Sequence, residues 1–173
     1  MVEAIGRILV SEEQISARME ELGRQISEDY QGKELMLVCV LKGSFLFAAD
    51  LMRKITVPCQ IDFMCVSSYS GGVKSSGLVK ILKDVSEPIE GKDILIIEDI
   101  LDSGLTLSHL TQILKMRKPA SIQVCTLLNK PGRREALVYP YYTGFTVPDE
   151  FVIGYGLDYD EKYRNLPYIA SLT

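Results

Sequence analysis

The chain has 173 residues, of which 47% are hydrophobic and 24% charged, and its formal net charge at pH 7 is −4. This length is typical of one domain with a single substantial core. A net negative chain lacks the basic surface that nucleic acid requires, so we exclude nucleic acid as the main partner. Small anionic substrates stay possible, because they need only local cations or a metal.

The cysteine spacing and the absence of long apolar runs indicate the compartment. No two of the four cysteines form a C-x-x-C pair, which argues against zinc, and we expect free buried thiols. The start, Met-Val-Glu-Ala-Ile-Gly, lacks the basic and apolar regions of a signal peptide. No apolar run approaches the ~18 residues of a membrane span. We therefore expect a cytoplasmic protein without membrane contact.

The first half of the chain alternates helical and strand patterns. Apolar spacing predicts a helix over residues 11–31, with Ser11 and Gln14 as a capping box and Gly32 as the C-cap. Then come a strand at 35–41, a helix at 45–54, a strand at 60–67, a small polar loop at 68–77 and a returning strand at 78–82.

The second half continues with a strand at 93–98, a helix at 105–116 and a strand at 122–128. Strands that alternate with helices predict an α/β fold, with a central, mostly parallel sheet flanked by helices. We expect one domain over 1–173. About ten N-terminal residues and the segment after about 130 do not fit the alternation, and we expect them to form a small hood over the ligand crevice.

The strongest functional signal follows the strand at 93–98. Its aliphatic run ends in the adjacent carboxylates Glu98 and Asp99, then Asp102 and a Ser-Gly-Leu-Thr turn at 103–106. Carboxyl ends of parallel strands face the crevice where open α/β sheets bind ligands. The turn could simply cap the next helix, but repelling carboxylates beside it favour an anion site next to a hydroxyl-rich or metal-bound ligand. Asp102 could be an N-cap, a general acid or base, or both.

Three further segments are candidates. Lys42-Gly43-Ser44 is either a solvated strand tip or a second anion-binding turn that opens a helix. The loop at 68–77 is either a mobile hairpin or a lid that covers the reacting centre with Tyr69.

The tail from 147 to 168 is the third. By composition it is an aromatic-rich packing segment, but Phe151 offers a ring face, Asp158 a carboxylate and Arg164 a cation suited to phosphate. His109, the sole histidine, we expect to be structural.

Five motifs occur in an order that resembles the type I phosphoribosyltransferases. They are Leu-Lys-Gly-Ser at 41–44, Ser-Tyr at 68–69, Glu-Asp-Ile-Leu-Asp-Ser-Gly-Leu-Thr at 98–106, Leu-Leu-Asn-Lys at 127–130 and Phe-Val-Ile-Gly-Tyr-Gly-Leu-Asp-Tyr at 151–159. The motif at 98–106 is similar to the phosphoribosyl-pyrophosphate (PRPP) motif of the whole superfamily. The motif at 151–159 resembles the hypoxanthine(-guanine) branch.

The resemblance implies a role for each matched residue. Asp102 would be the general base at the purine N7. The ribose and 5′-phosphate would contact Glu98, Asp99, Asp102, Ser103, Gly104, Leu105 and Thr106. Pyrophosphate would contact Lys42, Gly43, Ser68, Tyr69 and Arg164. The purine would contact Lys130, Phe151, Val152 and Asp158, and Mg²⁺ would be held at Glu98, Asp99 and Asp158. Leu105 stands where some relatives carry a polar or basic residue, which leaves backbone contacts intact.

The resemblance implies a purine-salvage enzyme that transfers phosphoribose from PRPP to hypoxanthine, and to guanine, in a homodimer or homotetramer. We expect adenine to be rejected, because Lys130 would meet a donor instead of the 6-oxo acceptor. The alternatives are transfer to xanthine, orotate or uracil, or a PRPP-sensing regulator without chemistry. Whether the peptide before Lys42 is cis stays open.

Overall fold

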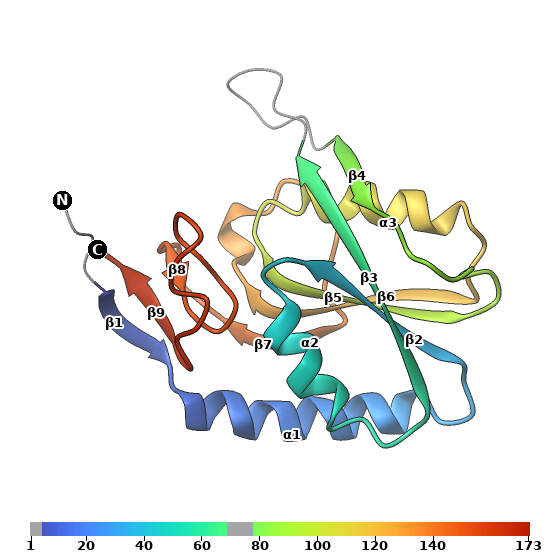
Figure 1. Ribbon diagram of the computed structural model, residues 1–173, viewed down its shortest axis with the longest axis horizontal. Helices are drawn as coiled ribbons and strands as arrows, with labels where there is room; N and C mark the ends of the chain where they lie inside the picture. Colours follow the sequence, from blue (N-terminus) through green and yellow to red (C-terminus); the bar gives the residue numbers. More distant parts are fainter. Residues whose placement is uncertain (1–4, 69–77) are drawn as a thin grey trace.

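A computed structural model describes residues 5–68 and 78–173 of the chain (Figure 1). The predicted lid residue Tyr69 lies outside the described residues. The strands are β1 (Ile5–Val10), β2 (Leu35–Leu41), β3 (Cys59–Ser68), β4 (Val79–Lys83), β5 (Asp93–Leu101), β6 (Ser121–Asn129), β7 (Tyr142–Thr146), β8 (Val152–Ile153) and β9 (Ile169–Leu172). The helices are α1 (Glu12–Asp29), α2 (Phe45–Met52), α3 (Leu105–Lys115) and the short 3₁₀ helix η1 (Pro131–Arg133).

The predicted α/β architecture is confirmed. Six strands form one sheet in the order β4-β3-β2-β5-β6-β7. All neighbouring strands in it pair in parallel except β4, which pairs antiparallel with β3. The parallel strands β2, β5 and β6 lie at its centre, so their carboxyl ends meet at one edge of the sheet.

Alternating side chains of the central strands fill two separate cores. Leu37 of β2 and Leu95 of β5 pack with α1 and α2, whereas Val38 and Ile96 face the opposite side with α3. Figure 1 shows α1 and α2 on one side of the sheet and α3 on the other. Because both faces are covered, the central strands read as continuous aliphatic runs.

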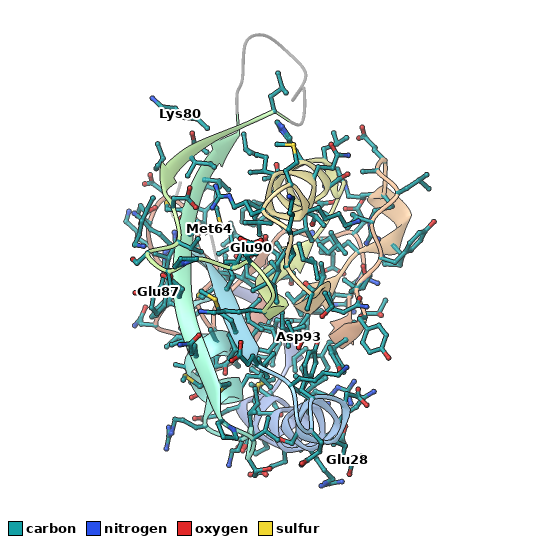
Figure 2. The ribbon with its side chains drawn as sticks, turned by 90° about the vertical axis from the view of Figure 1, so that its right-hand side faces the viewer. Glu28, Met64, Lys80, Glu87, Glu90 and Asp93 are labelled. Carbon is teal, nitrogen blue, oxygen red and sulfur yellow. The ribbon has the colours of Figure 1, made fainter. Side chains whose placement is uncertain are left out.

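Side chains fill the space between these layers, as Figure 2 shows with Met64 of β3, which is fully buried among them. In the same view Asp93, at the amino end of β5, and Lys80, on β4 beside the carboxyl end of β3, lie toward opposite ends of the sheet. The amino and carboxyl ends of the strands therefore lie at opposite ends of the sheet. The side chains that we predicted to bind substrate lie at the carboxyl end.

The predicted capping box of α1 is confirmed, but the helix ends earlier than expected. The Ser11 hydroxyl accepts from the Gln14 amide at 3.1 Å, and the Gln14 side chain accepts from the Ser11 amide at 2.8 Å. The C-cap is Tyr30, and Gly32, which we expected there, lies in the following turn at φ +72°. The apolar spacing extended the prediction because Tyr30 is itself buried.

The segments that we expected to form a hood contain a small antiparallel sheet in the order β1-β9-β8, and we keep the name hood for this sheet. β1 comes from the start of the chain and β8 and β9 from its last residues, and Figure 1 shows them together beside the main sheet. The expected boundary at about 130 differs from what is observed, because β7 pairs in parallel with β6 and so belongs to the main sheet. The Tyr- and Pro-rich surroundings of β7 hid this strand from pattern analysis.

Several other elements match the prediction within a few residues. The largest difference is at β5, which continues three residues beyond the expected end at Glu98. All four cysteines are free, as expected, although Cys59 and Cys65 are only half-buried. His109 has a structural contact, since its Nδ1 accepts from the Val79 amide at 3.2 Å and joins α3 to β4. In the described residues no helix is both long and apolar enough to cross a bilayer.

Candidate active site

Three neighbouring parallel strands each deliver a predicted functional residue to the same edge of the sheet. β2 is followed at once by Lys42, β5 by Asp102 and β6 by Lys130. The Lys130 amide donates to the Leu101 carbonyl at 2.9 Å, which fixes the ends of β5 and β6 together. This is the edge at which open α/β sheets bind ligands.

Glu98 and Asp99 lie on the part of β5 that extends past β2. The pairing of β5 with β2 ends at Ile97, while its pairing with β6 continues to Leu101. Both carboxylates are half-buried, and within the described residues neither forms an ion pair with a lysine or arginine. Burial and the neighbouring Asp99 carboxylate raise the pKa of Glu98 well above its ordinary value, and burial also raises the pKa of Asp99. The pair therefore favours a cation or hydroxyl groups as its ligand.

Asp102 lies between these carboxylates and the predicted phosphate turn. It is not the N-cap of α3, because that position belongs to Gly104 at φ +79°. The Asp102 Oδ1 atom is buried with no hydrogen-bond partner, and Arg133 Nε lies 3.5 Å from it. The Ser103 carbonyl accepts from the amides of Glu135 and Ala136, which holds the turn against the segment after η1.

The Lys42-Gly43-Ser44 turn is tightly enclosed. The Leu41–Lys42 peptide bond is cis. A Cβ added at Gly43 would collide with the Asp99 carboxylate, so a larger residue there would have to displace this side chain. A Cβ at Gly156 would likewise collide with the Gly43 carbonyl, which shows that the C-terminal tail packs directly on this turn.

Arg164 is held in the tail by three acceptors. Its guanidinium donates to the Gly156 carbonyl at 2.7 Å and lies 3.2 Å from both Asp158 Oδ1 and Glu161 Oε1. Glu161 Oε2 also lies 3.3 Å from Lys42 Nζ. The adjacent Lys42 and Arg164 cations lower the pKa of Glu161. The two cations predicted to bind pyrophosphate thus share one carboxylate.

Three of the four predicted purine-binding residues lie where the end of β6 meets the segment that leads into β8. Lys130 is only 6% exposed and its Nζ donates to the Glu150 carbonyl at 2.6 Å. The Phe151 ring is 54% exposed and meets Tyr159 edge-to-face at 5.6 Å, which leaves ring surface for stacking. Val152 is buried in β8.

Sequence reasoning missed Arg133, Asp149 and Glu161. Arg133 bridges Asp102 and Asp149, with its Nη1 atom 3.4 Å from Asp149 Oδ1. The position of Arg133, three residues after Lys130, could have indicated that it lies near the site. Nothing in the sequence indicated the pairing of Glu161 with Lys42. Ser68, one of the residues predicted to bind pyrophosphate, is the last residue of β3.

The carboxylates fit magnesium in chemistry, although not as a closed cage. Across 5–68 and 78–173, no three His, Cys, Asp or Glu side chains gather to hold a metal by themselves. The oxygen donors of Glu98 and Asp99 suit Mg²⁺, which is commonly bound by one or two carboxylates together with substrate phosphates and water. Asp158 is already engaged by Arg164 and by the Glu161 amide at 2.9 Å.

Comparison with known proteins gives consistent matches over nearly the full chain. Residues 8–160 match the family described as the phosphoribosyl transferase domain. The chain is 53% identical to a hypoxanthine phosphoribosyltransferase of Salmonella typhimurium, covering 96% of this chain and 94% of the relative. It is 53% identical to a hypoxanthine-guanine phosphoribosyltransferase of Mycobacterium bovis, covering 97% and 86%.

Solved structures agree with these sequence matches. A hypoxanthine phosphoribosyltransferase from Staphylococcus aureus superposes with a TM-score of 0.96 at 52% identity, covering 98% of this chain and 92% of that one. A hypoxanthine-guanine phosphoribosyltransferase from Bacillus anthracis gives 0.93 at 48% identity, covering 99% of both chains.

Proposed function

Because this chain belongs to the phosphoribosyltransferase family, in its hypoxanthine(-guanine) branch, we propose that it is a purine-salvage enzyme. It would transfer the 5-phosphoribosyl group of PRPP to N9 of hypoxanthine, and of guanine, and release pyrophosphate. The products would be inosine and guanosine monophosphate.

One observation carries this proposal. Lys42, Asp102 and Lys130 follow the neighbouring strands β2, β5 and β6, so the groups that would meet the leaving pyrophosphate, the purine N7 and the 6-oxo position lie along a single edge. We therefore expect a ligand with a diphosphate, a ribose and a purine to lie along this edge.

The charges suit the breaking of the bond between C1 and pyrophosphate. The sugar gains positive character, and the leaving pyrophosphate takes the bonding electron pair and gains negative charge. Lys42 and Arg164 would stabilise the departing pyrophosphate, while Glu98 and Asp99 would hold the ribose hydroxyls near the cationic sugar. Mg²⁺, when bound with PRPP at Glu98 and Asp99, supplies further charge neutralisation at the leaving group. The turn from Ser103 to Thr106 would hold the 5′-phosphate.

The purine would be bound on three sides. Asp102 would act as a general base and accept the proton of N7 as N9 attacks the sugar. Lys130 would donate to the 6-oxo group, and Phe151 would stack on the ring. The backbone at Val152 and Asp158 would meet the 2-position edge of the base. A 6-amino purine places a donor against the Lys130 ammonium, which leaves a buried cation unmatched.

The test is nucleotide formation from PRPP with each free base, with and without magnesium. We expect turnover of hypoxanthine or guanine to exceed that of adenine by roughly 10⁴-fold in kcat/KM. Xanthine, orotate and uracil complete the panel, and Lys130→Met, which keeps the apolar stem, should lose hypoxanthine use. Adenine turnover comparable to that of hypoxanthine would contradict the base assignment, and no turnover of any base would favour a regulator.

A further inference from the structure

Glu161 lies where the pyrophosphate of the proposed reaction has to bind. Its two carboxylate oxygens contact different cations: Oε2 lies 3.3 Å from Lys42 Nζ, and Oε1 lies 3.2 Å from Arg164 Nη2. Lys42 and Glu161 are 119 positions apart in the sequence. One carboxylate therefore joins the end of β2 to the C-terminal tail through the same two cations that pyrophosphate would use.

The packing beneath this contact is rigid. Gly156 lies directly against the Gly43 carbonyl, so the tail cannot shift relative to the Lys42 turn without separating these backbones. The Arg164 guanidinium donates a hydrogen bond of 2.7 Å to the Gly156 carbonyl, and its side chain is only 20% exposed. Arg164 is thus held by a contact that does not involve Glu161, whereas the Lys42 side chain is 64% exposed.

Glu161 itself can be displaced. Its side chain is 65% exposed, and it is bound to the fold through its backbone, where its amide donates to Asp158 Oδ2 at 2.9 Å. Ion pairs of this exposure contribute little, so a diphosphate with more charge and more oxygens can replace the carboxylate. The replacement still has a cost, because each cation exchanges an existing partner for a new one.

We propose that Glu161 is an internal competitor for the pyrophosphate subsite, which lowers the affinity for the diphosphate of PRPP and for the pyrophosphate product. This rests on the proposed function, in which Lys42 and Arg164 bind the diphosphate. In the absence of substrate the carboxylate keeps the two cations paired. After transfer it returns to them and so favours release of pyrophosphate.

The neighbouring residue Asp160 provides a matched control. It is an acidic side chain that is 78% exposed, and it lies 3.7 Å from Lys162 Nζ. Asp160 and Glu161 both have a positive φ, and in each variant the amide has the same length and branching as the acid that it replaces. Asp160→Asn and Glu161→Gln each remove one negative charge from the same turn, but only Glu161→Gln removes the contact with the predicted pyrophosphate cations.

The experiment is calorimetric binding of magnesium pyrophosphate to the full-length wild-type protein and both variants, together with the KM for PRPP. We expect Glu161→Gln to bind pyrophosphate about 2–30-fold more tightly, the range expected from two partly exposed ion pairs, and to lower the KM for PRPP. We expect Asp160→Asn to match the wild type. Thermal unfolding of each variant verifies that it is folded.

Three outcomes contradict the proposal: unchanged binding in Glu161→Gln, weaker binding in Glu161→Gln, or equal tightening in both variants. Weaker binding would make Glu161 a residue that positions the cations, and equal tightening would indicate a general effect of charge. A wild-type protein that binds no pyrophosphate and forms no nucleotide would instead refute the proposed function. The two failures are therefore distinguishable.

Discussion

Asp102 has the surroundings of a reactive group and not those of a structural acid. Its Oδ1 atom is buried without a hydrogen bond, and the contact that balances its charge is a loose ion pair with the half-exposed Arg133. A buried acceptor without a donor is costly, so it is retained where a ligand supplies the donor. A purine N7 that carries a proton would supply this donor.

We therefore predict that Asp102→Asn slows nucleotide formation by ~10²–10⁴, the usual contribution of general acid–base catalysis. The amide keeps the size of the side chain but cannot accept the proton. Binding of PRPP should survive, because the phosphate turn and the cations are unchanged. Steady-state kinetics with calorimetry of PRPP binding measures both quantities, and wild-type turnover in this variant would exclude the proton-transfer role.

At the residue scale, the sequence predicted the carboxylates and Lys42 because they lie at the ends of recognisable strands, and it predicted Lys130 and Phe151 through the motifs that resemble the family. It did not predict which other side chains of the protein contact them in the absence of substrate. The pairing of Lys42 with Glu161 and of Asp102 with Arg133 depends on how distant segments pack. Periodicity and local motifs carry no information on such contacts, because Glu161 and Arg133 look like any other charged residues in the sequence.

At the scale of elements, β5 shows why strand ends are harder to predict than strand centres. The aliphatic run at 94–97 predicted the centre of this strand correctly, because both faces of the strand are buried there. The strand continues to Leu101 because β6 still pairs with it there, although β2 has already turned away. Pairing with one neighbour tolerates the polar Glu98 and Asp99, and this is where the site opens.

An ion pair away from the candidate site joins the end of β4 to the end of α3. Asp84, directly after β4, accepts two hydrogen bonds of 2.7 Å from the guanidinium of Arg117, just after α3. Hydrogen bonding to Arg117 lowers the pKa of Asp84. A carboxyl with a lowered pKa stabilises the folded state above its ordinary pKa, and this contribution is lost as the pH falls through the lowered value.

We predict that Asp84→Asn lowers the free energy of unfolding by about 0.2–1 kcal/mol at neutral pH, since the pair is partly exposed. The difference from wild type should disappear in acid, where the wild-type carboxyl is also protonated. Urea unfolding across a pH series measures this, with Arg117→Gln and the double variant completing the cycle. A coupling energy that stayed constant down to acid pH would contradict the assignment.

At the scale of the whole molecule, the site is assembled from segments that are far apart in the chain. The turn after β2, the end of β5, the start of η1 and the tail from Phe151 to Arg164 all meet at one edge. The tail forms part of the hood through β8, so the hood is fixed by the same packing that completes the site. Only the folded chain has these groups together, and a nucleotide that contacts them all binds the folded state alone.

Such a ligand stabilises the fold by mass action, and the size of the effect is predictable. At 100 times its Kd, a nucleotide that binds only the folded state adds about 2.7 kcal/mol to the free energy of unfolding. For a chain of this length that corresponds to a rise in Tm of roughly 5–11 °C. We predict this rise for inosine monophosphate with magnesium, measured by calorimetric melting. Adenosine monophosphate at the same concentration should raise the Tm much less, because its 6-amino group opposes the Lys130 ammonium. Equal shifts for the two nucleotides would mean that the phosphate and ribose contacts dominate and that Lys130 does not read the base.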